Sequence, residues 1–473
     1  MFLRILEHRF VQRSIQTRLP FKFGVQILRD VPLAELKIEV ETADGRREMG
    51  RAGDLLVPKW FEKNPGRTPE EDSMALAASV ERAADLAREL TVTAGPHPVF
   101  DIAEVLRIER VGSRNHGDAD VLVRGFGVAM VERAIIDAAC RLAEVSFDQG
   151  IRGDLFGFQA RRLVAETGDW SPAMLPARLD RLPVRHTIGM LDPLTDDDVD
   201  PGDRVDDGLP QTLVQDIRRY GLRRFKIKIC GERELDEPRL RAIAAVVSRH
   251  ADGDTAFTLD GNEQCVDLDA LAGMLEDLAR DAATAPLVQR LALIEQPLPR
   301  RDTFQVEHRP GIERLSRIAP VIIDEADTDA GAFQRALQVG YAGVSVKACK
   351  GVFRAVANRG LVEVVRARGG IAFQSGEDLT NLGSIPLQQD LCLQATLGVA
   401  DVERNGHHYF RGLDHLGEEV AKELAAALPR LYENHEDQSS LRITGGTLDL
   451  RDLVDSSGFG GDLHSMPIHL GSK

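Results

Sequence analysis

Three carboxylate side chains each end a short apolar run in the middle of the sequence. Asp260 ends the run AFTLD, Glu295 ends LALIE, and Asp324 ends PVIID. Such runs predict strands, and the parallel strands of a β/α barrel end together at one mouth, where active sites are built. Three carboxylates with no histidine or cysteine among them form a hard oxygen site, which suits Mg²⁺ or Mn²⁺ better than zinc.

Lysines end the runs on either side of these three acids. Lys226 and Lys228 lie in RFKIKI, and Lys347 ends AGVSVK. Alternation along a strand places Lys226 and Lys228 on the same face. A lysine close to a divalent cation and to a second lysine is expected to have a lowered pKa, so that it can act as a base near neutral pH.

This set of side chains is suited to removing the weakly acidic α-proton of a carboxylate. A divalent ion would bind the substrate carboxylate and stabilise the enediolate that forms as the proton leaves. Lys347 would approach from across the mouth, opposite Lys228. Two bases on opposite faces of one carbon permit racemisation or epimerisation, whereas one base with a passive cationic partner permits syn-elimination or cycloisomerisation.

Each of these residues, taken alone, also has a purely structural explanation. A single Asp after a strand is often a helix N-cap, and a lysine at a strand end is often a solvated charge on the rim. The order across five successive predicted strands is Lys, acid, acid, acid, Lys. Independent caps and rim charges would rarely give this order, so we interpret the residues as one site.

The elements that must position these residues alternate between strands and helices from about residue 184 onward. The predicted strands are 184–189, 224–229, 256–260, 291–295, 320–324, 342–347 and 371–375, with a weak eighth run near 398–402. The predicted helices between them include 213–220, 238–248, 268–278 and 353–368. Strand ends fall roughly 20 to 40 residues apart, the size of one βα unit. We therefore predict an α/β fold with a (β/α)7β TIM-like barrel over residues 179–412.

The segments on either side of the barrel lack this alternation of strands and helices. Residues 1–178 predict an α+β capping domain, with a strand at 36–42, its return strand at 48–50, and helices at 70–90 and 127–144. The turn-rich segment 413–473 is expected to return to this domain, with 441–450 as a candidate hairpin. Between the first two barrel strands, 192–207 holds eight Asp and a single Arg, and we expect a solvated, flexible loop.

Composition excludes several classes of protein. The 473 residues carry a net charge of −16, so a nucleic-acid partner is not expected. The five cysteines are odd in number and widely spaced, which predicts reduced, mostly buried thiols without a disulfide framework or zinc-thiolate site. Neither a signal peptide nor an apolar run of membrane-spanning length is present, so we expect a cytoplasmic protein without a membrane partner.

The ordered set resembles the enolase superfamily, in the branch of muconate-lactonizing enzymes, dipeptide epimerases and o-succinylbenzoate synthases. The matching motifs are Lys226-Ile-Lys228, Asp260-Gly-Asn262, Glu295-Gln-Pro-Leu-Pro, Asp324-Glu325 and Lys347-Ala-Cys-Lys350-Gly351. The resemblance implies Asp260, Glu295 and Asp324 as Mg²⁺ ligands, with Mn²⁺ as an alternative metal. It further implies Lys228 and Lys347 as the acid/base pair and Lys226 as an accessory cation, with Asn262 and Glu325 as accessory residues. A small-molecule carboxylate substrate and a homo-oligomer are expected.

The likeness extends to two segments of the predicted capping domain. Leu19–Gly24 and Gly53–Phe61 look like the family's two loops over the active site. They make Phe21, Lys22, Lys59 and Trp60 candidates for recognising the distal end of the substrate. An ordinary turn with partly buried aromatic side chains is the alternative explanation.

Departures from the family pattern bear on the reaction. The seventh run reads Gln374-Ser-Gly-Glu377, without the histidine of the mandelate-racemase branch, which favours Lys/Lys chemistry. Asp401-Val-Glu403 is the nearest equivalent of the acidic pair with which dipeptide epimerases hold the substrate ammonium. We therefore expect a racemase or epimerase of the dipeptide or N-acyl amino acid type. A muconate cycloisomerase, o-succinylbenzoate synthase or acid-sugar dehydratase, and a non-catalytic metal-binding barrel, remain alternatives.

Overall fold

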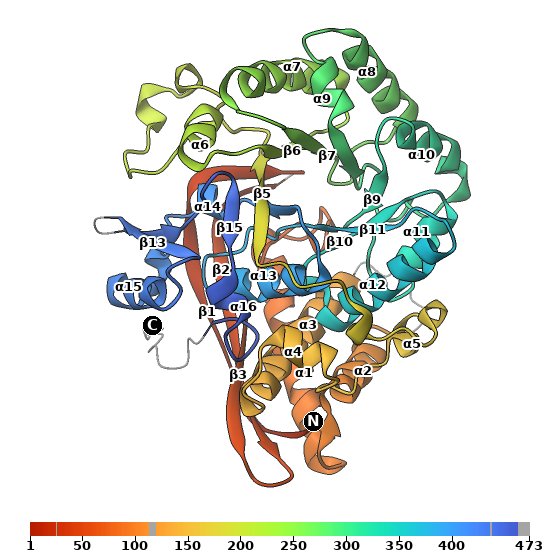
Figure 1. Ribbon diagram of the computed structural model, residues 1–473, viewed down its shortest axis with the longest axis vertical. Helices are drawn as coiled ribbons and strands as arrows, with labels where there is room; N and C mark the ends of the chain where they lie inside the picture. Colours follow the sequence, from red (N-terminus) through yellow and green to blue (C-terminus); the bar gives the residue numbers. More distant parts are fainter. Residues whose placement is uncertain (25, 113–119, 436–437, 462–473) are drawn as a thin grey trace.

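A closed barrel of eight parallel strands forms the centre of the protein (Figure 1). The computed structural model describes residues 1–24, 26–112, 120–435 and 438–461. Each strand pairs with the next along the chain, and the last pairs with the first, with Glu403 opposite Arg185. The strands are β5 (Arg181–Ile188), β6 (Arg224–Lys228), β7 (Ala256–Asp260), β8 (Leu291–Glu295), β9 (Val321–Ile323), β10 (Gly343–Val346), β11 (Phe373–Gly376) and β12 (Val402–Arg404). The barrel prediction is confirmed, including the weak eighth strand.

Helices connect the strands and cover the outside of the barrel. They are α6 (Leu213–Tyr220), α7 (Arg233–His250), α8 (Leu268–Arg280), α9 (Ala285–Gln289), α10 (Arg309–Ser316), α11 (Ala332–Gln338), α12 (Val352–Ala367) and α13 (Ile385–Leu397). Helix α6 begins and ends where its sequence predicts, because the Thr212 side chain accepts from Gln215 N and Gly221 takes a left-handed conformation. No helix in the described part of the chain is long and apolar enough to cross a membrane.

The N-terminal region forms an antiparallel sheet covered by helices, as the sequence predicts for a capping domain. The sheet order is β3-β2-β1-β4, made of β1 (Phe2–Phe23), β2 (Gln26–Thr42), β3 (Arg47–Leu55) and β4 (His97–Pro98). Helices α1 (Pro69–Thr93), α2 (Val99–Arg110) and α3 (Val121–Leu142) pack together against it. The segment Leu19–Gly24 is largely the end of the long strand β1, where the sequence suggested a loop.

The C-terminal segment contacts both the barrel and the N-terminal region. Strand β13 (Tyr432–His435) pairs with β14 (Gln438–Leu441), whereas β15 (Thr447–Asp449) pairs antiparallel with barrel strand β5. The expected hairpin over 441–450 is present only as a tight turn, in which Thr444 and Thr447 exchange two backbone hydrogen bonds. The strands on either side of this turn pair with β13 and β5 and not with each other. The chain then reaches the N-terminal region, where Phe459 packs on Phe147 with ring centroids 4.4 Å apart. Residues 462–473 of the predicted segment 413–473 lie outside the described residues.

The aspartate-rich segment 192–207 is mostly exposed, as expected of a solvated loop, but both of its ends are anchored to the rest of the protein. Asp192 accepts hydrogen bonds from Gly189 N at 2.6 Å and from the Tyr409 hydroxyl at 2.5 Å. Asp207 accepts two hydrogen bonds from Arg18 of β1, at 2.6 and 2.8 Å. Because the segment follows the end of β5, these bonds fix it between the barrel mouth and the capping domain.

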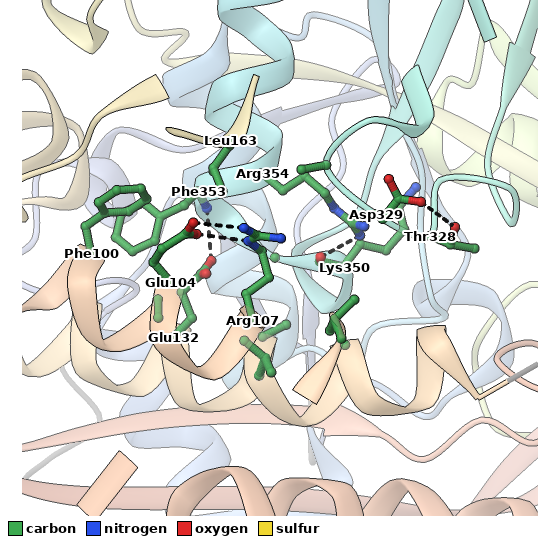
Figure 2. Close-up of a pocket in the computed structure, with 17 residues that line it drawn as sticks. Phe100, Glu104, Arg107, Glu132, Leu163, Thr328, Asp329, Lys350, Phe353 and Arg354 are labelled. Atoms are coloured by element: carbon green, nitrogen blue, oxygen red, sulfur yellow. Dashed lines mark hydrogen bonds and ion pairs between the residues drawn. The ribbon is translucent and has the colours of Figure 1, made fainter. Parts of the chain in front are cut away.

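A buried carboxylate joins the capping domain to the barrel (Figure 2). Glu132 of α3 accepts hydrogen bonds from the backbone N–H groups of Val352 and Phe353, at the start of α12. These two N–H groups have no partner within their own helix, so the carboxylate caps it. Burial raises the pKa of Glu132 to about 7, although the two backbone hydrogen bonds oppose the rise. The contact lies directly after the segment that carries Lys347 and Lys350.

We expect Glu132→Gln to change how stability depends on pH. A folded-state pKa of about 7, against the usual 4.5, means that the folded protein binds the proton more tightly than the unfolded chain. As the pH rises from about 4.5 to about 7, wild type therefore loses up to about 3 kcal/mol of stability through this group. The free energy of unfolding in urea should therefore rise in the variant relative to wild type, by about that amount, between pH 5 and pH 8. A difference between the two proteins that does not change with pH would contradict the raised pKa.

Candidate active site

The predicted catalytic and metal-binding side chains meet at the C-terminal mouth of the barrel. Residues Lys228 of β6, Asp260 of β7 and Glu295 of β8 are direct neighbours in the strand register. Asp324 follows β9 and Lys347 follows β10. All five side chains are buried, and the three carboxylates are fully so. The parallel barrel thus collects residues that lie far apart in the sequence.

Lys228 and Lys347 face each other across one cavity. They come from β6 and β10, which lie four strands apart in the closed barrel of eight. Lys228 Nζ donates to Asp260 Oδ2 at 2.5 Å, and Lys347 Nζ donates to Asp324 Oδ2 at 2.6 Å. Both lysines line the same cavity. A molecule held there would have an ammonium or amine group on each side.

The surroundings of the three predicted metal ligands shift their pKa values in different directions. Burial raises the pKa of Glu295, and the nearby Asp260 and Glu377 raise it further. Burial also opposes ionisation of Asp324, but the ammonium groups of Lys347 and Lys350 hold its pKa well below its usual range. Oε1 of Glu295 accepts no hydrogen bond, whereas Oε2 lies 2.6 Å from Lys226 Nζ. A buried carboxylate with an open oxygen next to two others fits a hard cation.

Lys226 lies at the centre of the acidic side chains. Its Nζ is within 3.0 Å of a carboxylate oxygen of Asp260, Glu295, Glu377 and Glu403, and the side chain is only 1% exposed. Burial alone would lower the pKa of Lys226, but the carboxylates, Asp260 first, raise it well above its usual value. Lys226 is thus a fixed cation beneath the cavity, consistent with the accessory part expected of it.

The pKa of Lys347 is raised above its usual value. Burial favours the neutral amine, but the surrounding carboxylates, Asp324 first and then Glu295 and Glu403, together outweigh burial. The lowered pKa expected of a lysine beside a divalent cation stays a prediction. Lys347 Nζ also lies 4.4 Å from the centroid of the Trp60 ring, a cation–π distance.

The structure adds two charged residues that the sequence argument did not single out. Glu377 follows β11, and its carboxylate contacts Lys226 at 2.7 Å and Arg185. Arg185 of β5 is buried inside the barrel and donates to Gly376 O at 2.8 Å. In the sequence, this strand end is informative only through its lack of a histidine. Arg185 and Thr187 alternate within an apolar strand, and this alternation was the available signal for a polar interior.

Four of the candidate substrate-binding residues line the cavity between the two lysines. They are Phe21 at the end of β1, Trp60 after β3, Asn262 after β7, and Glu403 of β12. The ring of Phe21 also stacks on Tyr409, with centroids 4.2 Å apart. Asp378, which follows Glu377, lines the cavity as well. The capping domain therefore supplies aromatic side chains, and the barrel supplies charged ones.

The structure does not bring the remaining candidates into this lining. Lys22 alternates with Phe21 and therefore points to the other side of strand β1. Asp401 precedes β12 and lies 4.0 Å from Arg224 at the start of β6, away from the mouth. Lys59 pairs with Asp72 of helix α1 at 3.1 Å. Glu325 is buried behind the cavity, where it accepts from Asn262 Nδ2 at 3.2 Å.

Comparison with family models gave no match, and no curated protein matches the sequence. Solved structures do match over nearly the whole chain. An enolase from Bradyrhizobium complexed with magnesium and mandelic acid has a TM-score of 0.59 at 14% identity, covering 97% of this chain and 96% of that one. A dipeptide epimerase from Enterococcus faecalis complexed with Mg and L-Leu-L-Tyr has 0.57 at 15%, covering 97% and 99%. A muconate lactonizing enzyme from Pseudomonas fluorescens complexed with muconolactone has 0.55 at 16%, covering 97% and 96%.

At these identities the comparison concerns the fold. The matches cover both the capping domain and the barrel, which agrees with the architecture described above. The chain has the fold of the mandelate racemase and muconate lactonizing branch of the enolase superfamily, an α+β capping domain on a (β/α)7β barrel.

Proposed function

We propose that this chain is a metal-dependent enzyme of the enolase superfamily that abstracts the α-proton of a carboxylate substrate. The observation that carries the proposal is the pair Lys228 and Lys347, on opposite sides of one cavity beside three buried carboxylates. Asp260, Glu295 and Asp324 would hold one Mg²⁺ ion, or Mn²⁺ in its place. When bound, the ion supplies positive charge that stabilises the negative charge developing on the substrate carboxylate.

The side chains of the protein would divide the proton transfers between them. One lysine takes the α-proton from its face of the substrate, and the other returns a proton to the opposite face, which inverts the carbon. Asp260 and Asp324 orient the two lysines through the hydrogen bonds already formed. Phe21 and Trp60 would exclude water and pack on the distal end of the substrate. Inversion makes a racemase or epimerase the leading proposal.

The lining of the cavity supports an amino acid derivative as substrate. Glu403 and Asp378 line the cavity together with Asn405. Carboxylate and amide oxygens accept hydrogen bonds from an ammonium or amide N–H group, which a dipeptide or an N-acyl amino acid carries next to its α-carbon. The structural neighbour from Enterococcus faecalis is a dipeptide epimerase. We therefore place dipeptides and N-acyl amino acids first among candidate substrates.

A proton-exchange screen tests this function. The enzyme is incubated with dipeptides, N-acyl amino acids and acid sugars in D₂O with Mg²⁺, and loss of the α-proton signal is followed by NMR. We expect exchange with at least one class, its loss in EDTA, and its recovery with added Mg²⁺. Glu295→Gln, which keeps the side-chain shape but removes the charge, should lose Mg²⁺ binding in calorimetry. No exchange together with no divalent-ion binding would favour a non-catalytic barrel.

Product analysis separates the reactions within this class. Dehydration changes the mass of the substrate, whereas epimerisation and cycloisomerisation in ordinary water do not. Chiral chromatography then distinguishes an inverted centre from a closed ring. A product with lost water would replace the epimerase proposal by a dehydratase.

A further inference from the structure

A second cluster of ligand-type side chains lies outside the cavity between the two lysines. His186 of β5, Asp216 of α6 and His407 of α14 (Gly406–Tyr409) each offer one ligand atom, and these atoms all lie within 4.8 Å of one another. His186 and Asp216 are buried, and His407 is half-buried. None of the three lines the cavity that holds Lys228 and Lys347.

The side chains of the cluster are in close contact with one another. His186 Nδ1 lies 3.1 Å from His407 Nε2, and His186 Nε2 lies 3.7 Å from Asp216 Oδ2. Ligand atoms about 2.0–2.1 Å from a tetrahedral zinc ion are roughly 3.3–3.4 Å from each other. One imidazole ring binds an ion through only one of its nitrogens, and one ligand atom from each of the three residues lies within 4.8 Å of the other two. A bound ion would draw these three atoms together.

The carboxylate of Asp216 is incompletely satisfied. Its Oδ1 is buried and accepts no hydrogen bond. His408 Nδ1 lies 2.9 Å from Asp216 Oδ2 as an ion-pair partner, which leaves Oδ1 open. His407 Nδ1 is buried and also lacks a hydrogen-bond partner. A buried carboxylate with an open oxygen is costly, and a bound cation would satisfy it.

We propose that His186, Asp216 and His407 form a second metal site, for a transition-metal ion of the zinc class. Two imidazole nitrogens and one carboxylate oxygen are a ligand set typical of zinc and unlike the all-oxygen set of the barrel mouth. His408 orients Asp216 from outside the coordination shell, as second-shell partners of metal ligands do. A cavity lined by His407, Tyr220 and Leu209 borders the cluster at His407 and gives the ion a route to it.

The site would tie the barrel closure to the capping domain. Its ligands come from the first barrel strand, the first barrel helix and the segment after the last strand, next to the β12–β5 pairing that closes the barrel. The residue after His408 is Tyr409, which stacks on Phe21 over the cavity of the two lysines. A metal ion at the cluster therefore fixes the segment against which the end of β1 packs, and it should raise thermal stability.

Zinc titration of the full-length protein tests the proposal. The chain is stripped with EDTA, saturated with Mg²⁺ to fill the mouth, and titrated with Zn²⁺ by calorimetry, while Co²⁺ binding is followed by its visible absorption. We expect one Zn²⁺ per chain and a rise of several degrees in Tm. His407→Ala and the isosteric Asp216→Asn should weaken binding by about 100-fold or more and abolish the rise in Tm. His435→Ala, at an exposed histidine of β13, is the matched control and should bind as wild type.

Zinc titration of Glu295→Gln distinguishes zinc binding at the barrel mouth from zinc binding at the cluster of His186, Asp216 and His407. Zinc binding that persists in this variant places the ion at the histidines, whether or not the proposed proton transfer exists. Loss of zinc binding in Glu295→Gln would assign the ion to the mouth and overturn the proposal. Equal zinc affinity in wild type, His407→Ala and Asp216→Asn, or no binding in wild type, would also overturn it. Should His407→Ala not fold, the Co²⁺ spectrum of wild type decides, because imidazole ligation gives a spectrum distinct from that of an all-oxygen site.

Discussion

Lys228→Met and Lys347→Met should each lower turnover by about 10²–10⁴-fold, the usual effect of removing a general acid or base. Each variant should retain α-proton exchange with one stereoisomer of the substrate, and the two variants should retain opposite ones. This follows from the positions of the lysines on β6 and β10, on opposite sides of the cavity. The remaining lysine can still remove and return a proton on its own face, but no residue can deliver one to the other face.

The measurement is the rate of deuterium incorporation into each pure stereoisomer, followed by NMR for wild type and both variants. Lys22→Met is a suitable control, since Lys22 points away from the cavity on the same strand as Phe21. Undiminished exchange of both stereoisomers in either variant would show that the substituted lysine is not a base. If one variant loses all exchange while the other keeps the wild-type rate, the protein has a single base. That result would indicate a lyase or cycloisomerase.

The barrel could be predicted because its strands and helices have different periods and lengths. Strands 256–260 and 291–295 and helix 213–220 begin and end where the sequence places them. Helix α7 begins at Arg233, five residues before Pro238, where the sequence suggested its start. Proline is most favourable in a first helical turn, so it is a natural choice for a helix start. Here the helix extends through it instead.

The long strand β1 could not be predicted from alternation. Its middle part, from Val11 to Gln16, is half-buried on one face and exposed on the other, and no residue in it is fully buried. Arg13 stands between Val11 and Ile15 on the half-buried face, which weakens the apolar pattern that would reveal a strand. Its regular pairing with β2 is visible only in the structure.

At the barrel mouth, too, the residues at the strand ends could be predicted from local sequence patterns, whereas the contacts between distant residues could not. The acids and lysines are readable because each ends a strand, and parallel strands end together. The contacts of Lys226 with Glu377 and Glu403 join residues 151 and 177 positions apart in the chain. Those contacts exist because the barrel closes through β12 and β5, which no local pattern encodes.

Lys226→Met should have the largest effect on stability. Lys226 is the shared ion-pair partner of Asp260, Glu295, Glu377 and Glu403. Removing one partner of a buried ion pair leaves uncompensated charge, which typically destabilises a protein by about 3–5 kcal/mol. The loss should be greatest at pH 8, where the carboxylates are ionised in the unfolded chain and must be buried without their cation.

The sign of the pH dependence follows from the pKa values that Lys226 controls. Burial alone raises the pKa of Glu403, but Lys226, followed by Lys228 and Lys347, holds it far below its usual range. In wild type this group therefore stabilises the fold above the unfolded pKa, and the contribution is lost as pH falls. In the variant its pKa rises, so stability is lost as pH increases. The gap between wild type and Lys226→Met should widen from pH 5 to pH 8 in urea unfolding.

Two comparisons make this result specific to the buried network. Arg224→Met removes a cation from the start of the same strand, where Arg224 is only half-buried, and should cost less than about 1 kcal/mol at either pH. Mg²⁺ should raise the Tm of Lys226→Met more than that of wild type, because a divalent cation compensates the same carboxylates that Lys226 does. A gap that is the same at pH 5 and pH 8, and that Mg²⁺ leaves unchanged, would mean that Lys226 stabilises the barrel by packing and not by its charge.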